Sequence, residues 1–93
     1  MVQATTKWDV QDYLDSPEAI AGYLEAAFEE GDPAFIKTAL NDVARAIGIS
    51  KLERETGLTR AALYKAFGEK GNPTLDTLLK VTRALGVRLS IAA

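Results

Sequence analysis

Apolar residues recur at helical spacing in three long segments of this 93-residue chain. Residues 17–30 and 33–47 each begin with proline and follow a serine or an aspartate. The polar residue can cap a helix and proline fits its first turn, so both segments are predicted to be helices. Residues 75–85 form the third, and each segment is followed by a glycine. In the third helix the predicted inward-facing residues are Leu75, Leu78, Leu79, Val81 and Leu85.

The segment of residues 50–67 predicts two short helices joined by a tight turn. Ser50 and Glu53 have the spacing of a capping box, in which each side chain accepts a backbone N–H of the first helical turn. Gly57 stands where the first helix must end in a left-handed conformation, and Thr59 can cap the second. This pattern is typical of a helix-turn-helix, whose second helix enters the major groove of DNA.

The second of these helices, residues 60–67, has two chemically different faces. Steps of about 100° per residue place an apolar set toward the protein, namely Ala62, Leu63, Ala66 and Phe67. The other face offers a guanidinium for guanine, a methyl for thymine, and a phenol and an ammonium for phosphates. Its residues are Arg60, Ala61, Tyr64 and Lys65. An amphipathic helix whose charged face is only solvated is the alternative.

The end of the chain alternates apolar and polar residues, a pattern typical of a half-buried strand. Its apolar positions, Val87, Leu89 and Ile91, are also candidates for a dimer interface. A lone strand needs a partner edge from the N-terminal arm, a second copy or another protein, unless the segment is an extended tail on the helices. The sequence therefore predicts an all-α domain of residues 16–93, with five helices and a short C-terminal β-strand, preceded by an arm of residues 1–15.

The chain contains no cysteine and no histidine, which excludes several kinds of metal site and catalytic group. Neither thiolate metal sites nor histidine bases are possible. The carboxylates near Glu29 and Asp32 are typical of a solvated helix end rather than a metal site, so we expect no enzyme, no metal and no cofactor. The chain begins without the apolar core of a secretory signal and has no segment long enough to span a bilayer, which predicts a cytoplasmic protein.

Charge divides the chain into two unequal halves. Residues 1–48 contain three Lys or Arg and nine Asp or Glu, a net charge of −6, whereas residues 49–93 contain eight and four, a net charge of +4. A basic half suits the phosphates of DNA, and an acidic half suits a basic protein partner. Acidic residues that only keep the protein soluble are the alternative for the first half.

Several stretches of the chain resemble one family. The most specific are GDP at 31–33, DVARA at 42–46, LTRAALYKAF at 58–67, GNPT at 71–74 and LKVTRALGVRLS at 79–90. They resemble the HigA-like antitoxins, antidote proteins of prophage-type addiction modules with a Cro/lambda-repressor-type helix-turn-helix. The resemblance implies a lambda-repressor-like fold and a homodimer that binds double-stranded operator DNA at the promoter of its own operon. It also implies that the protein neutralises a co-expressed basic toxin, typically a ribonuclease resembling RelE or HigB.

Carried over to the matching positions, the resemblance implies DNA contacts from the second short helix and from the loop and cap that follow it. These positions are Thr59, Arg60, Ala61, Tyr64, Lys65, Lys70, Asn72 and Thr74. Glu53 departs from the family pattern, since related motifs have a small alanine there. A glutamate at this position must turn outward or find a partner, which bears on the angle between the two helices.

The arm at the start of the chain is the candidate toxin-binding segment. Trp8, Tyr13 and Leu14 are costly to expose to water, so they either bind the toxin or fold back on the protein's own helices. Two other functions are compatible with the sequence. One is a phage-type transcriptional repressor without a toxin, and the other is a helical adaptor that does not bind DNA.

Overall fold

The computed structural model describes residues 14–92, and these form five helices and no strand. The helices are α2 (Pro17–Glu30), α3 (Pro33–Ile47), α4 (Ile49–Thr56), α5 (Arg60–Phe67) and α6 (Leu75–Ala84). For this part of the chain the prediction of five helices is confirmed. The described residues include only the last two positions of the predicted arm, so Trp8 and Tyr13 lie outside them.

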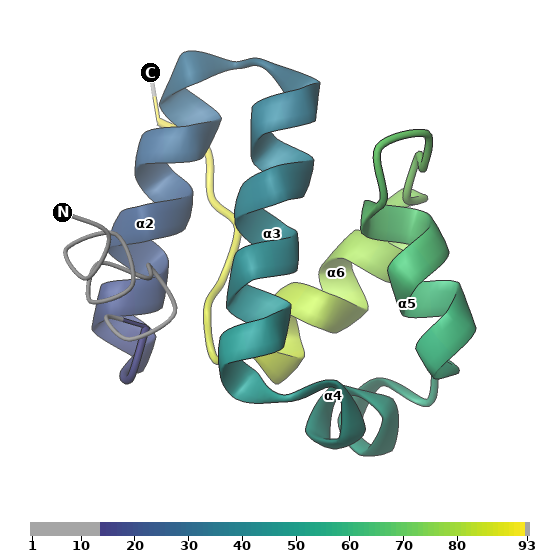
Figure 1. The fold of residues 1–93 in the computed structure, drawn as a ribbon. Helices are drawn as coiled ribbons and strands as arrows, with labels where there is room; N and C mark the ends of the chain where they lie inside the picture. Colours follow the sequence, from purple (N-terminus) through teal and green to yellow (C-terminus); the bar gives the residue numbers. More distant parts are fainter. Residues whose placement is uncertain (1–13, 93) are drawn as a thin grey trace, which may run out of the picture.

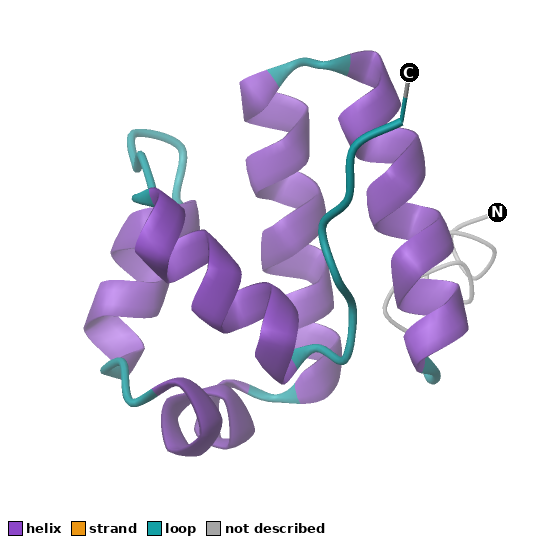
Figure 2. Ribbon diagram, turned by 180° about the vertical axis from the view of Figure 1, so that it is seen from behind, coloured by secondary structure: helices purple, strands orange, loops and turns teal. Residues whose placement is uncertain are grey.

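The five helices form a long antiparallel pair and a cluster of three shorter helices at one side. α2 and α3 lie side by side, and the three shorter helices cluster beside the C-terminal half of α3 (Figure 1). α3 packs against α2, α4 and α5, and α4 also packs against α5 and α6. Seen from behind, the residues after α6 run in an extended path along the α2–α3 pair (Figure 2). α3 therefore connects the two parts of the molecule.

The first two helices begin where the sequence predicts. The Ser16 hydroxyl accepts a hydrogen bond from the Ala19 N–H at 3.1 Å, and the Asp32 carboxylate accepts one from the Ala34 N–H at 3.0 Å. Gly31 ends α2 in the left-handed conformation, with φ of 72°. The Ser16 and Asp32 caps satisfy backbone donors that a helix leaves free at its first turn.

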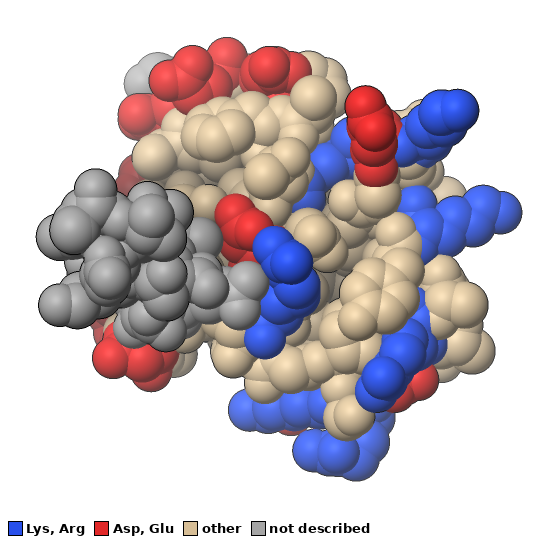
Figure 3. Space-filling view, viewed as in Figure 1, with Lys and Arg blue, Asp and Glu red and all other residues tan. Residues whose placement is uncertain are grey.

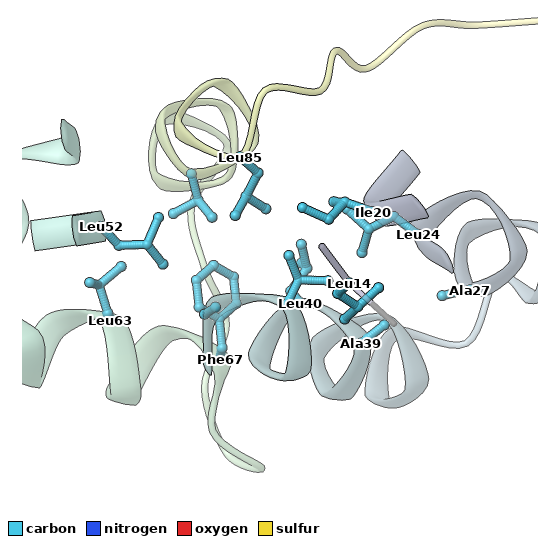
Figure 4. Close-up of a cluster of buried hydrophobic side chains, with 13 residues drawn as sticks. Leu14, Ile20, Leu24, Ala27, Ala39, Leu40, Leu52, Leu63, Phe67 and Leu85 are labelled. Atoms are coloured by element: carbon cyan, nitrogen blue, oxygen red, sulfur yellow. The ribbon is translucent and has the colours of Figure 1, made fainter. Parts of the chain in front are cut away.

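The hydrophobic core draws side chains from all five helices (Figure 4). Ile20, Leu40, Leu52, Leu63 and Val81, one from each helix, are at most 1% exposed. Because every helix contributes a buried anchor, the two short helices of residues 49–67 are held at fixed positions on the α2–α3 pair.

α6 presents a different face to the core from the one predicted. Leu75 and Leu79 are 68% and 40% exposed, so their predicted inward orientation is wrong. Thr82 is buried instead, at 3% exposure, and its hydroxyl donates to the Leu79 carbonyl at 3.1 Å. That internal bond removes the cost of burying a hydroxyl, which is why a threonine can replace an apolar residue here.

The predicted C-terminal strand is absent from residues 87–92. Val87 packs against the core and its N–H donates to the Thr82 carbonyl at 3.1 Å, whereas Ile91 is fully exposed. The described part of the chain contains no other strand that could pair with this segment. The alternative prediction, an extended tail lying on the helices, is the one that the structure supports.

A polar clamp joins α2 to α3. The Tyr23 hydroxyl donates to a carboxylate oxygen of Asp42 at 2.7 Å, and Arg45 pairs with the other oxygen at 3.1 Å. Burial, with a smaller contribution from the Asp42 hydrogen bond and charge, raises the pKa of Tyr23 to about 12. The clamp fixes the lateral position of α2 on α3.

Candidate nucleic-acid interface

The turn between α4 and α5 is held by its own side chains. Gly57 has φ of 77°, the left-handed conformation predicted for it. The Thr56 hydroxyl donates to the Leu52 carbonyl at 2.6 Å and accepts the Leu58 N–H at 3.1 Å. The Thr59 hydroxyl then accepts the Ala62 N–H at 3.0 Å and caps α5, as predicted. α5 therefore leaves the turn in a defined direction.

α5 turns one face inward and leaves the other in solvent. Leu63 and Phe67 are 1% and 4% exposed and fix the helix to the core. Ala62 is exposed, so its predicted inward position is wrong. Ala62 directly precedes Leu63, so its methyl points about 100° away from the Leu63 side chain around the helix. A helix of eight residues buries only a narrow stripe, and Ala62 lies outside it. The exposed face includes the four residues predicted for it, Arg60, Ala61, Tyr64 and Lys65.

Arg60, the first residue of α5, is bound to side chains of α4. Its backbone N–H donates to a carboxylate oxygen of Glu53 at 2.9 Å, and its guanidinium lies 3.5 Å from the other oxygen. The same guanidinium donates to the Ser50 hydroxyl at 2.9 Å. Glu53 thus finds the partner that its unusual position requires, and it adds a second cap to α5.

The same contacts overturn the predicted capping box at the start of α4. The helix begins at Ile49 after Gly48, with no side-chain cap, so Ser50 lies inside its first turn. Ser50 and Glu53 both turn toward Arg60 instead of toward the backbone of α4. For Ser50 the charged guanidinium is a stronger donor than a backbone N–H, since hydrogen bonds to ionised groups are stronger than neutral ones. Glu53 accepts the backbone N–H of Arg60 and lies near its guanidinium, so it gains a hydrogen bond and a charge pair together.

A surface groove brings together five of the eight residues predicted to contact DNA. It runs between the end of α5, the loop of residues 68–73 and the start of α6. Thr74 caps α6 by accepting the Thr77 N–H, and its hydroxyl also donates to the Thr77 hydroxyl, both at 3.1 Å. The predicted residues in the groove are Tyr64, Lys65, Lys70, Asn72 and Thr74, while Thr59, Arg60 and Ala61 lie outside it at the start of α5.

Lys37 of α3 holds the loop that forms one wall of this groove. Its ammonium donates to the Glu69 carbonyl at 3.0 Å and to the Gly71 carbonyl at 2.6 Å. These contacts span 32 and 34 residues of sequence, and no local pattern around Lys37 indicates them. Sequence reasoning therefore missed Lys37.

Basic and acidic side chains are distributed unevenly over the surface, although the exposed Glu55 and Glu69 lie in the more basic region. Lys and Arg side chains gather over α4, α5 and the following loop, while Asp and Glu gather where α2 meets α3 (Figure 3). The exposed basic residues of the first region are Lys51, Arg54, Arg60, Lys65 and Lys70. The charge asymmetry of the sequence thus becomes an asymmetry in space, with the groove on the basic side.

Comparison with known proteins identifies the family. A family model described as "Probable addiction module antidote protein" matches residues 4–93. The chain belongs to this family. It is also 37% identical, over 91 residues, to an uncharacterized protein of Haemophilus influenzae, a match that covers 98% of this chain and 94% of the relative. No solved structure matches the chain.

Among the other residues singled out in the sequence, Leu14 lies in the hydrophobic core of this antidote-family protein, 5% exposed. For Leu14, the structure therefore agrees with the alternative in which the arm folds back on the protein's own helices. The dimer candidates Val87 and Leu89 line a second groove, between α2, α6 and the tail, together with Leu79, whereas Ile91 lies outside it.

Two searches of the described residues were negative. No helix within residues 14–92 is both long and apolar enough to cross a bilayer. Over the same part of the chain, no group of three or more aspartates, glutamates, histidines or cysteines is placed to hold a metal ion.

Proposed function

We propose that this antidote-family protein is the antitoxin of a type II toxin–antitoxin module, and that as a dimer it represses its own operon by binding operator DNA. Its toxin would be a basic ribonuclease resembling RelE or HigB. The observation that carries the DNA-binding part is the groove between α5 and α6, which unites Tyr64, Lys65, Lys70 and Asn72 on the basic side of the molecule.

In this proposal α4 and α5 form a helix-turn-helix of the lambda-repressor type. α5 would enter the major groove with Arg60 and Ala61 toward base edges. Lys65, Lys70 and the amide of Asn72 would bind phosphates at the edges of the DNA major groove. The two lysines would release counterions from the DNA, which contributes to affinity. Thr74 donates its hydroxyl proton to Thr77, so only its acceptor lone pair or its backbone N–H is left for a contact.

Titration of the purified protein on the DNA upstream of its own gene, at two salt concentrations, tests the DNA-binding part. Binding should weaken steeply as salt rises. Lys65→Ala should reduce the slope of log K against log salt by about 1, and it should weaken all sequences similarly. Lys80→Ala removes the same charge outside the groove, from a lysine that pairs with Asp76, and serves as the control. Salt-insensitive or absent binding would instead support a helical adaptor.

The toxin-binding part rests on charge and on family membership. The outer face of α2 is acidic and exposed, with Glu25, Glu29 and Glu30 near its end and Asp32 just beyond. A basic ribonuclease would be attracted to this end, which lies away from the basic side. The arm residues Trp8 and Tyr13 remain candidates for apolar anchors of the same contact.

Co-expression with the protein encoded next to this gene tests the toxin-binding part. Glu25→Lys with Glu29→Lys should weaken protection against the toxin, whereas operator binding should persist. Deletion of residues 1–13 retains the buried Leu14 and tests the arm separately. If both variants protect fully, the toxin binds elsewhere. A neighbouring gene whose product is neither basic nor toxic would favour a transcriptional repressor without a toxin.

A further inference from the structure

Lys37 makes an unusual pair of contacts for a lysine on a helix surface. Its ammonium donates to the backbone carbonyls of residues 69 and 71, which lie on either side of Lys70 in the chain. An ammonium has three donors and is ordinarily solvated, so binding two carbonyls of one loop fixes that loop at two points. The side chain of Lys70, between these points, is exposed and lines the groove.

The loop is also pressed closely against the end of α5. A Cβ added at Gly71 would lie 2.0 Å from the Lys65 carbonyl oxygen and 2.5 Å from that of Ala66, so no side chain fits there. The one hydrogen bond between backbone atoms of residues 68–73 joins the Gly71 N–H to the Gly68 carbonyl at 2.9 Å. Since the loop has so little internal bonding, Lys37 is its main polar tie to the rest of the protein.

We propose that Lys37 is a positioning residue for DNA binding: it holds residues 69–71 so that Lys70 and Asn72 face the same phosphates as Lys65. This inference rests on the proposed DNA-binding function. Lys37 does not line the groove, so it acts through the loop and not by touching DNA. A flexible Lys70 would lose more conformational freedom on binding, and its contact would contribute less to affinity.

The test compares Lys37→Met, which keeps the aliphatic stem but removes the donors, with Lys37→Arg, which keeps both charge and donors. Amide hydrogen exchange of the free protein is the first readout. We expect Lys37→Met to speed exchange at the Gly71 N–H while α2 and α4 keep their protection, and Lys37→Arg to restore most of it. Unchanged exchange at Gly71 in Lys37→Met would overturn the inference whether or not DNA is present.

Operator binding of Lys37→Met, Lys70→Ala and the double variant is the second readout. We expect Lys37→Met to bind about tenfold more weakly and to lower the salt slope by about 1, as Lys70→Ala does. The double variant should be little worse than Lys70→Ala alone, because both changes remove the same contact. Additive losses and slopes would show instead that Lys37 meets a phosphate itself, and would overturn the positioning role.

Lys80→Met, which removes a lysine of α6 outside the groove, is the matched control and should bind like the parent. A parent protein that does not bind its upstream DNA would overturn the proposed function and the DNA-binding part of this inference together. A parent that binds normally, with Lys37→Met equal to it, would overturn the inference alone.

Discussion

At the scale of single residues, Arg60, which we propose to contact a base edge, is already restrained by its neighbours in the free protein. The guanidinium has five N–H donors, and its contacts with Ser50 and Glu53 engage one end of it. The remaining donors are available to a base edge. Because the side chain is partly ordered in the free protein, less rotamer entropy would be lost if Arg60 bound DNA as proposed, which would favour selectivity at one base pair.

Arg60→Ala is therefore predicted to cost about 1–3 kcal/mol of operator affinity and to relax the preference at one base pair. Glu53→Gln keeps an acceptor for the Arg60 N–H but removes the charge that holds the guanidinium. We expect it to lower selectivity at that same base pair, and to have no effect on selectivity when Arg60 is already alanine. Competition binding with single-base operator variants measures both. Equal effects of Glu53→Gln in the two backgrounds would contradict the coupling.

Tyr23 gives a prediction about pH. Its phenol stabilises the α2–α3 pair only when protonated, because it donates to Asp42. The pKa is raised to about 12 from an ordinary 10.0, so the stabilisation is complete below pH 10.0 and is lost as the pH rises toward 12. Tyr23→Phe should lower the free energy of unfolding by about 1 kcal/mol at pH 7. That difference should shrink as the pH rises above 10.0 and should be gone by pH 12. Urea unfolding of both proteins across this range measures it, and a constant difference would exclude the phenol as its source.

At the scale of the elements, local signals were sufficient for the starts of α2, α3 and α5 but not for the cap of α4 or for the buried faces of the helices. The caps of α2, α3 and α5 join residues two or three apart, so both partners of each hydrogen bond lie within one short stretch of sequence. Which stripe of α6 is buried depends on neighbouring helices, and the outward position of Leu75 was therefore missed.

In the candidate site, too, the local features could be predicted from the sequence and the long-range contacts could not. Helical period alone placed Arg60, Ala61, Tyr64 and Lys65 on the exposed face of α5, although it placed Ala62 on the wrong face. Glu53 binds Arg60 seven residues later, and Lys37 reaches a loop more than 30 residues away, so neither role could be read from spacing. The tail has a strand pattern, but a strand exists only where a second edge is present.

Two glycines give opposite predictions for the same substitution. Gly71→Ala should destabilise the protein by about 1–3 kcal/mol, because the added methyl meets backbone carbonyls that cannot move aside. Gly22→Ala lies on the exposed face of α2 with nothing within 4 Å of the new methyl. It should stabilise by about 0.5–1 kcal/mol through lower entropy of the unfolded chain. Thermal unfolding of the two variants beside the parent tests the pair, and similar shifts for both would show that the loop yields easily.

At the scale of the whole molecule, we propose that a second copy binds at the second groove, between α2, α6 and the tail. Its lining includes the apolar residues Leu79, Val87 and Leu89 and the charged residues Glu18, Arg83 and Arg88. In a two-fold dimer the same patch meets itself, so an acidic residue of one copy can face a basic residue of the other. In this proposal the tail residues predicted for the dimer would contribute through the groove and not through a paired strand.

Leu79→Glu should weaken dimer formation, because it places a charge among the apolar residues that line this groove. Leu75→Glu changes a more exposed leucine of the same helix that lies outside the groove, and should leave the dimer intact. Sedimentation equilibrium at tens of micromolar distinguishes the two. A parent protein that is already monomeric at that concentration, or equal behaviour of both variants, would contradict this interface.

The separation of charge between the two ends of the molecule has a further consequence. It gives the protein an electric dipole moment, and near duplex DNA the negative potential exerts a torque on that dipole, within about 10 Å at 0.1 M salt. If the protein binds DNA as proposed, the torque would turn the basic side toward the duplex before contact and leave the acidic end of α2 facing solvent. A basic toxin could then reach the acidic end while the operator stays bound, so DNA, antitoxin and toxin could form a ternary complex without competing for space.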